Sequence, residues 1–342
     1  MRILEDVRAV WQDTRPTVLI RHPEWIMDAV LGDAVRPTDT VVITGFWRSG
    51  TTWLLETLSR ALRAKSVFEP LRPQITGYEA YASALYSGGE EAINGFMPFG
   101  RDRIAAAPTL HRHLHRALVG ATPGAFVRAA RFRVREHEDR VGASRFAQVR
   151  SRLQDSMRLQ VVTKFTRAHL LLPQIRAEWA PTVFHIRRDP RAVVESLLRQ
   201  EWSGWARSMS LADYLLVPED GRSEIFSRWK DLIHQCDERS YISRIAGYWA
   251  LTEWYVDQFA GDGVIPLEFE QLCREGIDYL RGTVEESSEI EISKEDMQGV
   301  SKTSKAEKST EERIHGWKDR LDASVVNEIE DVVRQCGMGK NI

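Results

Sequence analysis

Residues 45–53, with the sequence GFWRSGTTW, have the glycine spacing of a phosphate-binding loop. The nucleotide-hydrolysing Walker loop reads G-x-x-x-x-G-K-[ST], with a lysine directly after the second glycine. Here Gly45 and Gly50 hold the glycine positions, Thr51 replaces the lysine, and the cation is Arg48. The pattern predicts a loop that binds phosphate, and it leaves open which group is transferred.

A second basic motif, RRDPRAVVES at residues 187–196, follows a predicted strand and enters a predicted helix. Arg188 and Ser196 are eight residues apart in the sequence. That separation is about two helical turns, so both side chains can converge on one phosphate. We therefore expect two anion sites, which is what a nucleotide with phosphates at both its 5′ and 3′ ends requires.

Strands that alternate with helices would position these motifs. Residues 40–45, TVVITG, are an apolar, β-branched run that predicts a strand, and helical spacing begins at Thr51. Further strands are expected at residues 66–70, 159–165, 182–187 and 264–267, and helices at 170–179, 222–236, 240–260 and 322–336. This order predicts an α/β fold with a mostly parallel central sheet flanked by helices. Ligands of such sheets bind at the carboxyl edge of the strands.

The 342 residues are expected to form a single domain. A helical insertion is expected at about residues 75–155, and an exposed, mobile segment at about residues 285–312. Residues 101–152 contain 12 Arg against 4 acidic residues. This imbalance indicates either solvated helix faces or a basic wall over an anionic substrate.

The overall composition excludes several classes of partner. A formal net charge of −2 and a pI near 6.5 predict no general attraction to nucleic acid or to an anionic membrane. The cysteines Cys236, Cys273 and Cys336 have neither a zinc spacing nor a disulfide framework, which favours a reducing compartment. Because no apolar run reaches about 18 residues, we expect a cytoplasmic protein without a membrane span.

Together the two basic motifs resemble those of the sulfotransferases that use 3′-phosphoadenosine 5′-phosphosulfate. RSGTTW is similar to the 5′-phosphosulfate loop of that family, and RDPRAVVES is similar to its 3′-phosphate motif. FEPLRP, GYWALTEWYV, PLEFEQL and the C-terminal stretch from GWKDRL resemble the carbohydrate sulfotransferase branch and its bacterial relatives. The resemblance covers roughly residues 40–72 and 160–340. It implies a P-loop-like sulfotransferase fold, in-line transfer of a sulfuryl group, and no metal.

The resemblance also implies roles for individual residues. Arg48 would contact the oxygen that bridges the sulfate and the 5′-phosphate, and Lys164 matches a family lysine near the sulfuryl group. Trp53 resembles the aromatic residue that stacks on adenine, and Arg188 and Ser196 would bind the 3′-phosphate. The 5′-phosphate would be held by Ser49, Gly50, Thr51 and Thr52.

The base that takes the acceptor's proton has several candidates. Glu69 is preferred, because it lies at the end of a predicted strand beside the loop, in a region where several family branches use a glutamate. His169 lies five residues beyond Lys164, further than the family's lysine-to-histidine spacing. The remaining candidates are the insertion histidines His111, His113 and His115.

Other functions stay open from the sequence. A P-loop kinase or other phosphoryl transferase needs a Walker lysine and a carboxylate for Mg²⁺, and the lysine is absent. A third possibility is a noncatalytic binding protein. Such a protein would be expected to lack Arg48 or every plausible base, and this sequence retains both Arg48 and candidate bases. The acceptor is an open choice among hydroxyls or amines of small molecules and carbohydrates. The lid over the 3′-phosphate departs from the family pattern, which leaves Lys302, Lys305 and Arg313 as candidates.

Overall fold

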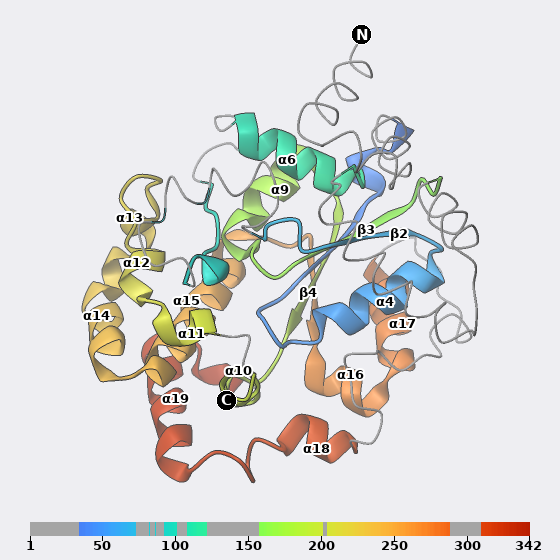
Figure 1. The fold of residues 1–342 in the computed structure, drawn as a ribbon. Coiled ribbons are helices and arrows are strands. Elements are labelled where there is room, and N and C mark those ends of the chain that lie inside the picture. Colours follow the sequence, from blue (N-terminus) through green and yellow to red (C-terminus); the bar gives the residue numbers. More distant parts are fainter. Residues whose placement is uncertain are drawn as a thin grey trace, which may run out of the picture.

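The computed structural model describes residues 34–72, 82, 86, 92–100, 108–121, 157–200, 204–287 and 309–342. These residues form a five-stranded, all-parallel sheet with the order β2-β3-β1-β4-β5 and helices on both faces (Figure 1). Its strands are β1 (Val41–Thr44), β2 (Lys65–Phe68), β3 (Val161–Phe165), β4 (Thr182–Arg187) and β5 (Val264–Glu268). The predicted α/β fold is confirmed, and all five predicted strands form with their ends displaced by at most two residues.

The strand order places the two basic motifs beside each other. Strand β1 leads to β2 on one side of the sheet, whereas β4 leads to β5 on the other side. Where the chain leaves adjacent parallel strands in opposite directions, a crevice opens at their carboxyl ends. The residues that follow β1 and β4 are residues 45–50 and 188–189, so both motifs border this crevice.

Alternate residues of β1 face opposite layers, as the pleat of a strand requires. Val41 and Ile43 pack against α4 (Thr51–Ala61), α16 (Phe269–Glu275) and α17 (Ile277–Ser287). Val42 packs on the other face against α6 (Pro108–Leu118) and α9 (Leu172–Trp179). Helix α4 therefore begins directly after the loop of residues 45–50, and its apolar side packs on the sheet.

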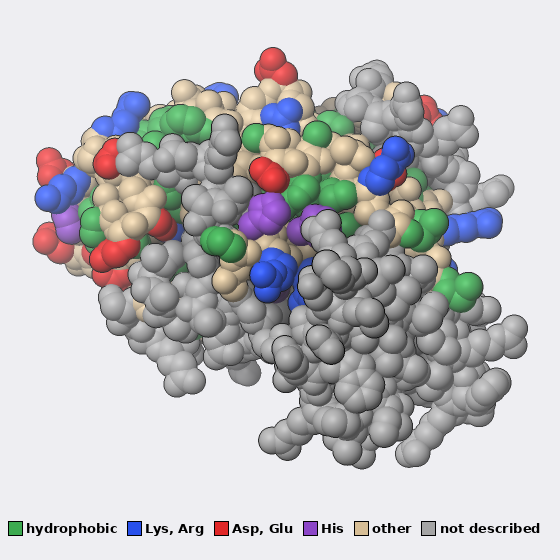
Figure 2. Space-filling view, turned by 90° about the horizontal axis from the view of Figure 1, so that it is seen from above, with side chains coloured by type: hydrophobic (Ala, Val, Ile, Leu, Met, Phe, Trp, Pro, Cys, Tyr) green, Lys and Arg blue, Asp and Glu red, His purple; other side chains and the backbone are tan. Residues whose placement is uncertain are grey.

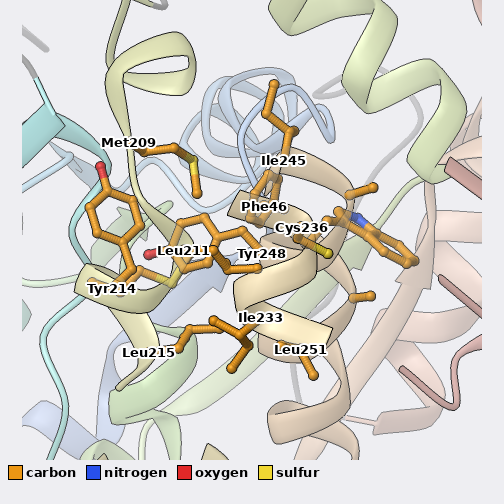
Figure 3. Close-up of a cluster of buried hydrophobic side chains, with 14 of the residues drawn as sticks. Phe46, Met209, Leu211, Tyr214, Leu215, Ile233, Cys236, Ile245, Tyr248 and Leu251 are labelled. Atoms are coloured by element: carbon orange, nitrogen blue, oxygen red, sulfur yellow. The ribbon is translucent and has the colours of Figure 1, made fainter. Parts of the chain in front are cut away.

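Beside the sheet lies a second, helical core built around the buried α15 (Tyr241–Phe259). Its other helices are α10 (Pro190–Leu198), α11 (Gly204–Ser208), α12 (Leu211–Leu215), α13 (Arg222–Phe226), α14 (Lys230–Arg239) and α19 (Ala323–Gln335). Figure 3 shows Phe46, from the loop after β1, in the same cluster as Tyr248 and Ile245 of α15. The loop is thereby tied to both cores.

The segments outside these cores agree with the sequence only in part. Of the predicted insertion at 75–155, the short helix η3 (Ala92–Gly95) and α6 are described, and most of the remainder lies outside the described residues. The predicted mobile segment at 285–312 begins within α17 and ends within α18 (Thr310–His315), and residues 288–308 lie outside the described residues. The predicted helix at 222–236 is divided into α13, η7 (Ser227–Trp229) and α14. No helix in the described part of the chain is long and apolar enough to cross a membrane.

Candidate active site

The loop between β1 and α4 requires glycine at both motif positions. Gly45 has φ +156°, and a Cβ atom there would lie 2.3 Å from the carbonyl oxygen of Ile186. Gly50 has φ +89°, and its Cβ would lie 2.8 Å from the ring of Phe269. Both values lie in the part of backbone space that favours glycine. The loop is therefore packed closely against β4 and α16, which fixes its shape.

Arg48 lies in a turn between two anchored segments of this loop. Phe46 and Trp47 are buried, with Phe46 edge-on to Tyr248 at 5.7 Å between ring centroids and Trp47 at 4.6 Å from Trp205. Arg48 itself has φ +71°, a left-handed conformation that costs a non-glycine residue about 1–3 kcal/mol. The buried aromatic pair on one side and α4 on the other hold it there.

The structure brings Arg48, Arg188 and Ser196 together. The Nε atom of Arg48 donates to Oγ of Ser196 at 2.8 Å. The Nη1 atom of Arg188 donates to the carbonyl oxygen of Arg48 at 2.7 Å. Arg188 also lies over the ring of Phe269, 4.4 Å from its centroid. The two basic motifs are thus joined through contacts of Arg48.

The electrostatics of this cluster favour a bound anion. Burial, followed by the nearby charges of Arg188 and Arg199, holds the pKa of Arg48 below its usual value. Burial likewise lowers the pKa of Arg188. Among the described side chains, three donors here are buried without a hydrogen-bond partner: Ser49 Oγ, Arg188 Nε and Arg313 Nε. Because unpaired buried donors are costly, these groups fit the oxygens of phosphate or sulfate.

The start of α4 supplies further donors at the same place. Gly50 is its N-cap residue, and no side chain in the described structure caps this end. Helix N-termini that carry uncapped N–H groups attract phosphate. Thr51 is buried at the first helical position, and the partly buried Trp53 packs against the apolar layer that α4 forms with β1. The predicted 5′-phosphate residues are therefore contiguous and face the crevice edge of the sheet.

Lys164 is at the carboxyl end of β3, beside this helix start. Its Nζ atom lies 3.1 Å from Oγ1 of Thr52 and 2.8 Å from Oε1 of Glu69. The ammonium group also lies 4.2 Å from the ring centroid of Phe68. Because Thr52 is in the first turn of α4, its contact with Lys164 places the ammonium group beside the start of that helix.

Glu69 is held by donors on both carboxylate oxygens. Oε1 faces Lys164, while Oε2 accepts from the backbone N–H and Oγ1 of Thr166, at 3.2 and 2.8 Å, and from Nη1 of Arg167 at 3.2 Å. Burial alone would raise the pKa of Glu69, but Lys164, Arg167 and Thr166 together lower it. A carboxylate that is stabilised in its charged form is a weaker base.

His169, the second candidate base, lies in a buried cluster away from any surface. It is 0% exposed, and its Nε2 atom lies 3.4 Å from Oε1 of Glu253. His185 Nε2 lies 2.7 Å from Oε2 of the same carboxylate, and Arg187 Nε donates to that oxygen at 2.8 Å. Two imidazoles and a carboxylate form a set that can ligate a metal. Glu253 already pairs with Arg187, however, and arginine is always charged. This pairing favours a structural role for the cluster over metal binding.

The insertion histidines occupy three different environments on α6. His113 is buried and donates from Nε2 to the carbonyl oxygen of Pro70 at 2.6 Å, and burial lowers its pKa. His111 pairs with Glu178 at 3.1 Å. His115 is partly buried. Figure 2 looks down on the α6 side of the molecule and shows histidine side chains near the middle of that face. The carbonyl group that His113 contacts belongs to Pro70, the residue directly after Glu69.

The C-terminal segment is fastened to α10 beside the second motif. Arg188 Nη2 donates to the carbonyl oxygen of Arg313 at 3.1 Å, and Arg320 Nε donates to Glu195 at 2.6 Å. The buried Trp317 lies 4.3 Å from the guanidinium of Arg191, measured to its ring centroid. Arg313 therefore borders the candidate site, whereas Lys302 and Lys305 lie outside the described residues.

Two charged residues with direct roles in these networks were not predicted from the sequence. Arg167 joins Glu69 to the carbonyl oxygen of Asn94 in η3, at 2.8 Å from its Nε. Glu253 is the acceptor at the centre of the histidine cluster. Each is a charge next to or within an apolar run, and that is the signal by which it could have been found. Neither a model of a known protein family nor a curated protein matches this chain.

Proposed function

We propose that this protein is a sulfotransferase. It moves a sulfuryl group from 3′-phosphoadenosine 5′-phosphosulfate directly to a hydroxyl or amine of a small-molecule or carbohydrate acceptor. The observation that carries the proposal is the convergence of both basic motifs on Arg48, whose Nε contacts Ser196 and whose carbonyl contacts Arg188. A nucleotide with a 5′-phosphosulfate and a 3′-phosphate presents one anionic group to each motif.

In this reaction Arg48 stabilises the leaving group. Negative charge grows on the oxygen between sulfur and the 5′-phosphate as that bond breaks, and a guanidinium beside it lowers the barrier. Arginine keeps its proton at any working pH, so Arg48 acts as a charge and a hydrogen-bond donor. Ser49 and the N-terminal N–H groups of α4 hold the 5′-phosphate, and Lys164 adds a second positive charge.

The bond changes balance without a further reactant. One S–O bond to the nucleotide breaks, and one S–O or S–N bond to the acceptor forms. The bonding electron pair stays on the nucleotide oxygen, the acceptor's proton passes to a base, and 3′-phosphoadenosine 5′-phosphate leaves. We also propose a cytoplasmic location, since the described cysteines are free thiols.

Phosphoryl transfer by a P-loop kinase has weaker support. The kinase needs the Walker lysine beside the β- and γ-phosphates, and Thr51 occupies that position. The cation of this loop is Arg48, which lies against the second motif through Ser196. No feature of the described site favours a γ-phosphate over a second phosphate on the ribose.

The test is incubation of the protein with 3′-phosphoadenosine 5′-phosphosulfate and a panel of sugar, phenol, lipid and amine acceptors, with detection of products by mass spectrometry. We expect an acceptor to gain the mass of one sulfuryl group, in EDTA as in its absence. A parallel incubation with ATP and Mg²⁺ serves as the comparison. Phosphorylated products from ATP, with no sulfated product, would assign the protein to the kinases instead.

A further inference from the structure

Glu69 and Lys164 form a buried ion pair beside the phosphate-binding loop. Their side chains are 7% and 4% exposed, and Oε1 lies 2.8 Å from Nζ. The backbone N–H of Glu69 also donates to the carbonyl oxygen of Lys164 at 3.0 Å, so β2 and β3 fix the two residues against each other. Glu69 has φ +53°, which turns its side chain back toward the end of β3.

We propose that Glu69 is a positioning residue: its carboxylate keeps the ammonium of Lys164 charged and fixed beside Thr52, and another group removes the acceptor's proton. The inference rests on the proposed function, in which Lys164 stabilises charge at the transferring group. It changes the role of Glu69 that the sequence favoured, from a base to the counter-charge of a cation.

The hydrogen bonds of Glu69 carry this assignment. Oε2 receives three donors, from the N–H and hydroxyl of Thr166 and from Arg167, and Oε1 receives the ammonium of Lys164. An incoming hydroxyl could reach Oε1 only by sharing that oxygen with the buried ammonium of Lys164. A carboxylate with four donors and almost no exposed surface is suited to holding its neighbours in place.

The charges that face Lys164 explain why it needs this partner. Arg48 comes from the loop after β1 and Arg167 from the turn after β3, and both are positive. Glu69, after β2, is the carboxylate in contact with the ammonium. Burial lowers the pKa of Lys164, the two arginines lower it further, and Glu69 raises it. Removing the negative charge of Glu69 therefore leaves a buried lysine among cations, which favours its neutral form.

Glu69→Gln tests the assignment because the two ends of an amide, one acceptor and one donor, cannot replace the two acceptor oxygens of a carboxylate. If its oxygen faces Thr166 and Arg167, its NH₂ group meets the ammonium of Lys164, donor against donor. We expect the pKa of Lys164 to fall, because the ammonium loses its one close opposite charge while burial and the two arginines still lower that pKa. The measurement is NMR titration of protein labelled at the lysine side-chain ε-carbon, with the Lys164 signal assigned from Lys164→Arg.

Turnover provides the second readout, with the acceptor that the mass-spectrometric panel identifies. The alkaline limb of the rate profile should move to lower pH in Glu69→Gln by the same amount, so that turnover recovers as the pH is lowered. Adding Lys164→Arg should abolish the shift, since arginine stays charged. As a control, Asp220→Asn breaks another buried pair, with Arg222, and should leave the profile in place.

Three results would overturn the inference: an unchanged Lys164 pKa in Glu69→Gln, turnover that is equally low at every pH, or a shift that persists with Lys164→Arg. The second of these is the behaviour of a lost general base. If Glu69→Gln does not fold, the test rests on Lys164→Arg alone. The alkaline limb of its rate profile must disappear, because arginine stays charged. A protein that binds no 3′-phosphorylated nucleotide would refute the proposed function, while the lysine titration would still report on the ion pair.

Discussion

Arg48 and Ser196 are 148 residues apart in the chain, and their side chains are joined by a hydrogen bond of 2.8 Å. The contact connects the loop after β1 with helix α10 after β4, at the crevice where the strand order reverses. Arg188 reinforces the connection by donating to the carbonyl oxygen of Arg48. A ligand with two anionic groups can therefore contact both motifs at once.

Arg188→Ala should weaken binding of 3′-phosphoadenosine 5′-phosphate roughly 10 to 100-fold, because charge-assisted hydrogen bonds contribute about 1.5–3 kcal/mol each. Binding of adenosine 5′-phosphate should change less, and calorimetric titration of both nucleotides measures the difference. Arg191→Ala is the matched control, since Arg191 is already paired with Asp189 and Glu330. Equal losses for the two nucleotides in Arg188→Ala would show that this arginine does not read the 3′-phosphate.

Arg48→Ala should lower kcat about 100-fold or more, the usual cost of losing one donor that stabilises developing charge. The affinity for the nucleotide product should fall far less, because the contact strengthens as the leaving group becomes charged. Arg48→Lys keeps a cation and should retain part of the activity. Rapid-quench and steady-state measurements separate kcat from binding, and a kcat within a few-fold of wild type in Arg48→Ala would remove Arg48 from the mechanism.

Gly45→Ala should destabilise the fold, since its Cβ would lie 2.3 Å from the carbonyl oxygen of Ile186. We expect a loss of about 1–3 kcal/mol or more in the free energy of unfolding from the strained backbone alone. Gly282→Ala in α17 is the matched control: a Cβ there meets no atom within 4 Å, and the change should stabilise the helix by about 0.5–1 kcal/mol. Denaturant titration measures both, and equal effects would contradict the close packing of the loop.

Glu253→Gln should lower the free energy of unfolding at neutral pH by about 3–5 kcal/mol, because Arg187 loses the buried carboxylate that pairs with it. Burial raises the pKa of Glu253, but His185, Arg187 and their hydrogen bonds outweigh it and hold that pKa well below 4.5. A folded-state pKa below the unfolded one means that the stabilisation is complete above about pH 4.5 and is lost as the pH falls further.

The difference between wild type and Glu253→Gln should therefore be constant above about pH 4.5 and narrow below it. Glu311→Gln, at a side chain that is 79% exposed, is the control and should have little effect. A difference that widens in acid would contradict the direction given for the pKa of Glu253. Urea denaturation at a series of pH values makes the comparison.

The sheet could be predicted because its signals are local. Each strand is a short run rich in apolar and β-branched residues, and the alternation with helices implies parallel pairing. The small helices α11, α12 and α16 could not be predicted from the sequence. They are too short to show a helical periodicity, and they are stabilised by packing against α15 or β5.

In the candidate site, too, the local motifs could be predicted and the contacts between distant segments could not. GFWRSGTTW and RDPRAVVES are motifs within single segments, so their positions at the sheet edge followed from the strands. The contacts of Glu69 depend on Lys164 and Arg167, which come from a different strand, and no local pattern specifies such a pair. His169 was a candidate despite its longer distance from Lys164 in the sequence, and the fold places it beside Glu253 in the interior.

The central claim is that this site binds a nucleotide phosphorylated at both its 5′ and 3′ ends, and the most direct test is calorimetric titration of the wild-type protein. The ligands are 3′-phosphoadenosine 5′-phosphate, adenosine 5′-phosphate, and ATP with Mg²⁺. We predict that the first binds roughly tenfold or more tightly than the second, since Arg188 and Ser196 supply at least one charge-assisted hydrogen bond to the extra phosphate. Equal affinity for the two adenosine phosphates, or a preference for ATP with Mg²⁺, would contradict the account.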